Sequence, residues 1–194
     1  MKYSERPALD HVYASLAEML EPADPNRAQP KLAMTIASAL AELGEDRSWA
    51  SVWWAYGAVR HDLSDSALEQ AFQLLDRVER PKEARAAALM LRAQVRYSQA
   101  VYAEATPDAS EQHALLQEAV ELAPGWPELR VRLARACKTI GDELAAKEHA
   151  ARAVELLAEV APTDDPFDAA ISGLSLDRAY VTKELEGLGL LATP

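Results

Sequence analysis

The four residues Ala119-Val120-Glu121-Leu122 recur unchanged as Ala153-Val154-Glu155-Leu156, 34 residues further along the chain. A recurrence at this spacing is typical of proteins built from stacked helical hairpins. The residues between the copies agree with this, because Gly141-Asp142 marks a turn and the small residues Ala146 and Ala153 lie on the helix that follows. Small residues allow antiparallel helices to approach closely. We therefore expect each copy to belong to the second helix of a hairpin.

The stretch from about Asp108 to Val160 resembles the tetratricopeptide family, whose period is 34 residues. Leu133-Ala134 takes the large and small positions of the family's first helix, and Pro124 closes the preceding copy. The chain departs from the motif at three aromatic positions, where it has Arg130, Cys137 and Ala150. The resemblance implies antiparallel hairpins stacked as a short right-handed superhelix. It also implies that the first helix of each hairpin lines a concave groove.

Helical periodicity continues almost from end to end, and no stretch alternates as a strand does. The sequence therefore predicts an all-α protein. The expected helices, in chain order, cover 8–20, 30–43, 46–61, 66–79, 81–104, 108–122, 126–140, 142–160 and 177–188, with a short helical turn at 167–172. The first eight pair into hairpins and form an array over residues 1–161, clearest at 108–160. Residues 162–194 are expected to form a linker, a capping helix for the last hairpin and a short tail.

Two of the expected helices begin with the spacing of a capping box. Ser66 precedes Glu69 by three residues, and Asp108 precedes Glu111 by the same distance. In this motif the side chain of the first residue accepts a hydrogen bond from a backbone amide of the first turn. We therefore expect the fourth helix to begin at Ser66 and the sixth to be capped by Asp108.

The composition indicates a globular protein of the cytoplasm. The 194 residues are 49% hydrophobic and 26% charged, which is enough for one continuous core. No apolar run is long enough to span a membrane, and the N-terminal residues do not resemble a signal peptide. The formal net charge of −11 argues against attraction to nucleic acid or to an anionic membrane. The single cysteine, Cys137, is expected to be a small core residue.

Charge alternates between the two helices of the second, third and fourth expected hairpins. The expected first helices at 46–61, 81–104 and 126–140 are net positive, whereas their partners at 62–79, 108–122 and 142–160 are net negative. In the tetratricopeptide arrangement the first helices face the groove and the second helices form the outer surface. The resemblance therefore implies a basic groove inside an acidic shell.

Helical geometry and the family register select candidate groove residues. Three arginines of the fifth helix are separated by seven and four residues, which places them on one face. Guanidinium groups bind carboxylates with paired hydrogen bonds, and an exposed tryptophan offers rigid contact area. We therefore predict a site for an acidic peptide or a free C-terminal carboxylate. Its candidate residues are Trp54, His61, Arg85, Arg92, Arg96, Val131, Arg135 and Lys138.

Plainer roles compete with these assignments. Any single arginine can pair with a carboxylate of a neighbouring helix instead of a ligand. Trp49 and Trp53 are expected in the core, while Trp54, on another face, is expected to be exposed. His61 can simply favour the end of its helix, and Trp126 is expected to pack at the turn between hairpins.

No catalytic or metal-binding motif is recognisable. The four histidines lie on different helices and lack ligand spacing, and there is no phosphate-binding glycine loop. We therefore expect no enzyme activity, no cofactor and no metal. The candidate functions are an adaptor or chaperone-like module that binds a protein or peptide, a structural subunit that associates through its outer face or its tail, and, with least support, an RNA-binding protein.

Overall fold

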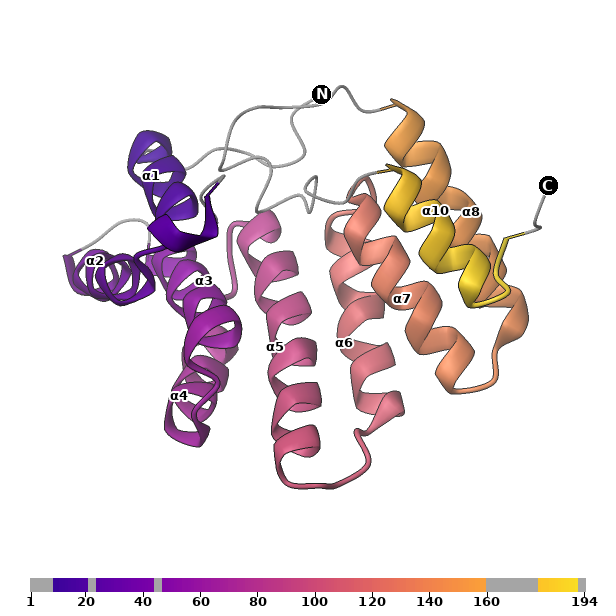
Figure 1. Ribbon diagram of the computed structural model, residues 1–194, viewed down its shortest axis with the longest axis horizontal. Helices are drawn as coiled ribbons and strands as arrows, with labels where there is room; N and C mark the ends of the chain where they lie inside the picture. Colours follow the sequence, from indigo (N-terminus) through magenta and orange to yellow (C-terminus); the bar gives the residue numbers. More distant parts are fainter. Residues whose placement is uncertain (1–8, 21–23, 44–46, 160–177, 192–194) are drawn as a thin grey trace.

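The computed structural model describes residues 9–20, 24–43, 47–159 and 178–191. These residues form nine α-helices and no strand (Figure 1). The prediction of an all-α fold is confirmed. The helices are α1 (Asp10–Leu20), α2 (Pro30–Leu43), α3 (Arg47–Gly57), α4 (Asp65–Asp76), α5 (Lys82–Tyr102), α6 (Ala109–Leu122), α7 (Pro127–Thr139), α8 (Glu143–Glu159) and α10 (Arg178–Gly187). Two short helical pieces, η1 (Pro25–Arg27) and η2 (Ala58–Asp62, a π-helical continuation of α3), accompany them.

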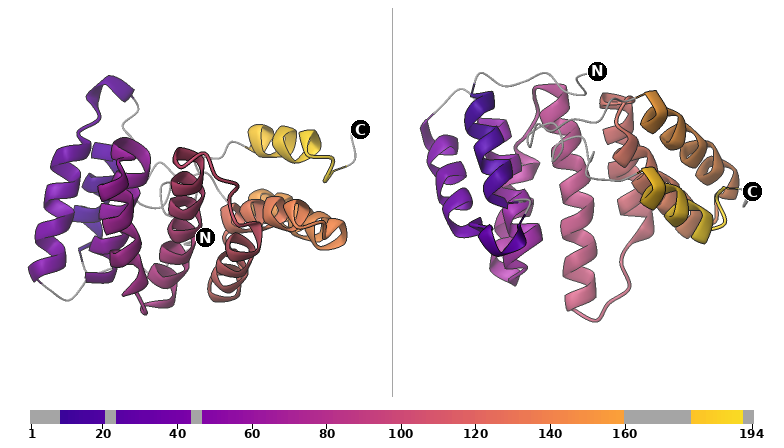
Figure 2. Two further views of the ribbon diagram at one scale, coloured as in Figure 1. Left: turned by 90° about the horizontal axis from the view of Figure 1, so that it is seen from below. Right: turned by 45° about the horizontal axis from the view of Figure 1, so that its top comes forward.

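Each helix packs against its neighbours in the chain, so the helices stack as antiparallel pairs. Contacts run continuously from α3 through α8, and α3 also touches α5. Figures 1 and 2 show α1 and α2 at one end of this array and α8 with α10 at the other. The predicted stacking of antiparallel helices is therefore confirmed.

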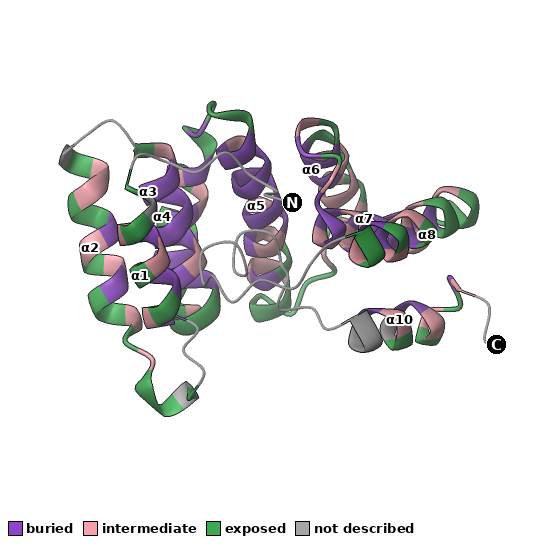
Figure 3. Ribbon diagram, turned by 90° about the horizontal axis from the view of Figure 1, so that it is seen from above, coloured by how far each residue is buried: buried purple, intermediate pink, exposed green. Residues whose placement is uncertain are grey.

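One hydrophobic core runs the length of the array (Figure 3). Small residues allow the helices to approach each other: Ala146, Ala150 and Ala153 of α8 are completely buried, as is most of the alanine run of α5. The largest fully buried side chains are Trp49, Trp53, Trp126, Tyr13, Leu16, Leu20, Leu68, Leu75, Leu89, Leu129 and Leu133.

The starts of α4 and α6 show one wrong and one correct prediction. Asp108 caps α6, because its Oδ1 accepts hydrogen bonds from the amides of Ser110 at 2.9 Å and Glu111 at 3.0 Å. Ser66 does not cap α4. Ser64 does so instead, since it has the extended backbone that a cap requires and its Oγ accepts from the Ala67 amide.

The C-terminal helix α10 packs against α8 and buries Val181 and Leu185. Gly189 ends it with a positive φ of 68°, a conformation that glycine adopts without strain. The chain then turns back, and Leu190 is buried. The short helical turn expected at 167–172 lies outside the described residues.

Candidate functional site

A groove of about 380 Å³ lies between α5, α6 and α7. The long helix α5 and the connection that follows it supply one wall, and α7 supplies the opposite wall. The groove is lined by Met90, Ala93, Gln94, Tyr97, Thr106, Pro107, Ala109, Gln112, Leu116, Arg132, Arg135, Ala136 and Thr139.

The lining combines buried apolar groups with exposed polar ones. Met90, Leu116 and Ala136 are buried, whereas Tyr97 is 48% exposed. Two arginines line the groove, and no carboxylate is among its lining residues. This local charge is opposite to the net charge of −11 of the whole protein. An anionic group would therefore meet complementary charge here.

Arg132 is held in place by two neighbours. Its Nε and Nη2 donate to Oε1 of Glu128 at 2.8 and 2.6 Å, and its Nη1 donates to Oε1 of Gln94 at 2.9 Å. The second contact joins α7 to α5 across the groove. Arg135, one turn further along α7, is exposed. The groove thus has two guanidinium groups in its lining, and that of Arg132 is paired with Glu128.

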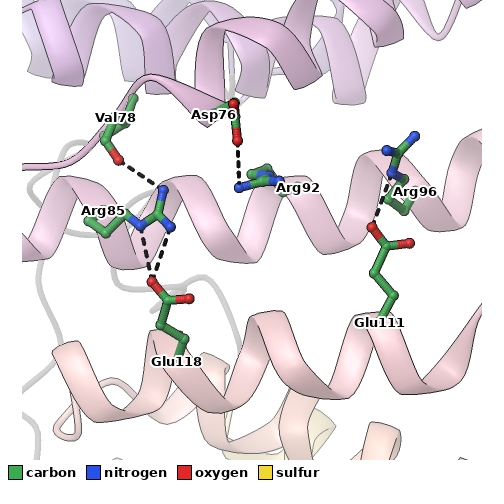
Figure 4. A network of polar contacts seen from close by, with 7 residues as sticks. All are labelled: Asp76, Val78, Arg85, Arg92, Arg96, Glu111 and Glu118. Atoms are coloured by element: carbon green, nitrogen blue, oxygen red, sulfur yellow. Dashed lines mark hydrogen bonds and ion pairs between the residues drawn. The ribbon is translucent and has the colours of Figure 1, made fainter.

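The three predicted arginines of α5 share one face (Figure 4), but none of them is among the residues that line the groove. Arg85 binds Glu118 of α6, with its Nε and Nη2 at 3.2 and 3.1 Å from Oε1. Arg92 pairs with Asp76 of α4 at 3.1 Å and Arg96 with Glu111 of α6 at 3.3 Å. They therefore join α5 to the acidic helices on both of its sides.

Phe72 of α4 reinforces these contacts. The guanidinium carbons of Arg92 and Arg96 lie 4.7 and 3.7 Å from the centroid of its ring. A cation over an aromatic face is attracted by the quadrupole of the ring. The structure thus favours the plainer alternative for these arginines, in which they pair within the protein.

The predicted exposure of Trp54 is wrong. Trp54 is only 9% exposed, and Ser51 and Ala58, which share its face at helical spacing, are also buried. The reason is that α3 contacts α1, α2, α4 and α5, so that no long face of this helix remains open. His61 is exposed, and its Nε2 lies 3.0 Å from the Leu20 carbonyl oxygen. Neither Trp54 nor His61 lines the groove.

The predicted residues of α7 divide between different environments. Val131 is buried, and Lys138 donates a hydrogen bond from Nζ to the Leu188 carbonyl at the end of α10. Arg135 alone among the eight predicted residues lines the groove. The sequence interpretation missed Met90, Gln94, Tyr97 and Arg132. The first three have helical spacing and occupy a different face of α5 from the arginines, a pattern that could have been recognised.

The described residues contain no cluster of His, Cys, Asp and Glu that could hold a metal ion. Cys137 is completely buried, and burial, followed by the nearby Asp142 charge, raises the pKa of its thiol. A thiol in this environment is a poor nucleophile. Within the described ranges, no helix has the length and apolar character needed to cross a membrane.

The chain matches no family model, no curated protein and no solved structure. The resemblance to tetratricopeptide repeats therefore depends on the residues of this chain and on the stacking of its helices. Any functional assignment depends on the groove itself.

Proposed function

We propose that this protein is a non-enzymatic, tetratricopeptide-like interaction module that binds a carboxylate-bearing peptide of another protein in the groove between α5 and α7. The observation that carries the proposal is the pair Arg132 and Arg135, which line a groove without a lining carboxylate in a protein of net charge −11. Electrostatic complementarity of this kind selects acidic partners and speeds their association.

The composition of the groove suits a short peptide. Arg135 can donate paired hydrogen bonds to a carboxylate, and the buried surface of Met90 and Leu116 can accept an apolar side chain. Gln94 and Gln112 provide amide groups for the peptide backbone. The volume of about 380 Å³ is in the range of natural ligand pockets.

The repeat arrangement supports the same proposal. If α3–α4, α5–α6 and α7–α8 are three successive hairpins, the groove lies between the first helices of the last two. Peptides bind on this side in the tetratricopeptide arrangement that the sequence resembles. In this proposal α10 covers α8 as the cap of the array.

Display of random peptides with a free C-terminus tests the proposal. We expect the protein to enrich peptides with acidic residues or an apolar residue beside the terminal carboxylate, and Arg135→Glu to abolish their binding. Lys147→Glu is the matched control, because Lys147 is an exposed residue of α8 outside the groove. Equal binding by Arg135→Glu and Lys147→Glu would exclude the groove as the site, provided that both keep the helical circular dichroism spectrum.

A further inference from the structure

Two successive hairpins place corresponding residues in contrasting surroundings. Glu83 and Arg85 near the start of α5 correspond to Glu128 and Arg130 near the start of α7, 45 residues later. In the second helices, the 34-residue repeat that aligns the two Ala-Val-Glu-Leu copies places Arg152 at the position of Glu118. The spacings differ because α5 and its connection to α6 are both longer than α7 and its connection to α8. Arg85 therefore corresponds to Arg130, and Glu118 to Arg152.

These residues form two corresponding contact regions, which we call the first and the second seam. The first seam is the ion pair of Arg85 with Glu118. Both Nε and Nη2 of Arg85 donate to one carboxylate oxygen. The second seam is the contact of Arg130 of α7 with His149 of α8, together with Arg152 of α8 and His113 of α6, which lie near enough for their charges to act on these two residues. An arginine takes the place of the glutamate there, so two cations stand where the first seam has a neutral pair. Burial, and then the charge of Arg152, lowers the pKa of Arg130.

Arg130 lacks the acceptor that Arg85 has. Its Nε is buried and has no hydrogen-bond partner, whereas the Nε of Arg85 donates to Glu118. Its Nη1 lies 3.1 Å from Nδ1 of His149. Because a guanidinium can only donate, Nδ1 must accept and the ring of His149 must be neutral in this contact. A buried donor without an acceptor costs free energy, so the second seam is electrostatically incomplete.

We propose that the second seam binds a small oxyanion, a phosphate or a carboxylate, in the role that the Glu118 carboxylate has in the first seam. The oxyanion supplies the acceptor that the Arg130 Nε lacks and separates the charges of Arg130 and Arg152. All four residues of the seam are partly exposed, so the seam lies at the protein surface although the Arg130 Nε itself is covered. The site is distinct from the groove, since none of the four lines it.

Acidic residues lie near the second seam, but none of them accepts a hydrogen bond from the Arg130 Nε. Arg152 keeps ion pairs with Glu155 at 2.8 Å and Glu159 at 3.4 Å along its own helix. Burial and the charges of Arg130 and His113 lower the pKa of His149, whereas the charges of Glu148 and Asp142 raise it. Since an anion favours protonated imidazole, binding and protonation of His149 should support each other.

The first experiment follows the imidazole signals of His149 and His113 by nuclear magnetic resonance in the full chain. Inorganic phosphate, acetate or chloride is added at constant ionic strength near pH 6.5. We expect saturable shifts of both histidines with phosphate, with acetate or with both, and none with chloride. The separate phosphate and acetate titrations identify the preferred oxyanion. Shifts that are the same for all three salts would show screening alone and would overturn the proposal.

The second experiment places a carboxylate in the second seam. Arg152→Glu should give Arg130 the partner that Arg85 has, so phosphate or acetate should bind at least about tenfold more weakly, the equivalent of one charge-assisted hydrogen bond. Lys147→Glu changes the same charge on the same helix and should keep wild-type affinity. Unchanged oxyanion affinity in Arg152→Glu would contradict the proposal. If that variant does not fold, Arg152→Gln should still weaken binding, and wild-type affinity in Arg152→Gln would equally overturn it.

Discussion

Arg85, Arg92 and Arg96 show how neighbours determine the role of a residue. Their spacing places them on one face of α5, and the structure confirms this geometry. Spacing alone does not say which helix that face meets. Asp76, Glu111 and Glu118 come from α4 and α6, on both sides of α5, and they pair with these arginines. The alternation of basic and acidic helices therefore reflects pairing within the stack around α5.

His149 should make stability depend on pH in the range just below neutrality. Burial first, and then the Arg130 charge, lowers the pKa of His149 from its usual value of 6.5. Between the lowered pKa and 6.5 the unfolded chain binds more protons than the folded protein, so the free energy of unfolding rises with pH. Stability is therefore lost as the pH falls through about 6.5 towards the lowered pKa.

Urea unfolding at pH 7.5 and 5.5, in a buffer free of phosphate and carboxylate, measures this effect. Wild-type protein should lose stability between the two pH values, and His149→Gln should lose less, because its side chain does not titrate. Carboxylates titrate mainly at lower pH and contribute similarly to both proteins. An equal loss in the two proteins would show that His149 does not contribute.

At the scale of the helices, periodicity predicted most of the structure. The predicted limits of α2 and α6 to α8 lie within a residue or two of those observed, because proline, glycine and aspartate mark their ends. The surroundings of α3 could not be predicted in this way. Ser51 and Trp54 of α3, and Ala58 at the start of η2, are buried because four other helices pack against α3, and the repeat motif of one hairpin does not encode such contacts.

The candidate site was predicted only in part for a related reason. Of the residues selected by the family register, Arg135 on α7 lines the groove. For α5, charge directed attention to its arginines, although the groove meets another face of the same helix. The position of a groove depends on the packing of three helices, and a charge pattern within one helix does not determine it.

The start of α4 provides a matched pair of variants. Ser64→Ala removes the acceptor of the Ala67 amide and should lower the free energy of unfolding by about 1 kcal/mol. Ser66→Ala, in the first turn of the same helix, should have a clearly smaller effect because Ser66 is not the N-cap. Chemical unfolding of the two variants measures the difference. A larger loss in Ser66→Ala would assign the cap to Ser66, as the capping-box spacing predicted.

At the scale of the whole molecule, the described chain exposes several large apolar side chains. Tyr97, Val101 and Tyr102 belong to the second half of α5, Ile140 follows α7, and Leu144 lies in the first turn of α8. Such residues can contact a partner or another copy of the chain. Self-association thus remains an alternative to peptide binding, and light scattering over a range of concentrations distinguishes a monomer from an assembly.

The contact of α10 with α8 should protect one end of the array from association. Val181, Leu185 and Leu190 are buried there, and Lys138 holds the Leu188 carbonyl. Leu185→Asp places a charge in this contact and should cost about 2–4 kcal/mol, in line with the loss of a buried leucine and the burial of a carboxylate. If α10 detaches, the apolar face of α8 becomes accessible, and the mass measured by light scattering should rise with concentration above that of the wild type.

Lys183→Asp, at an exposed position of α10, should retain wild-type mass and stability. If Leu185→Asp also behaves as the wild type in both measurements, α10 does not cap the array.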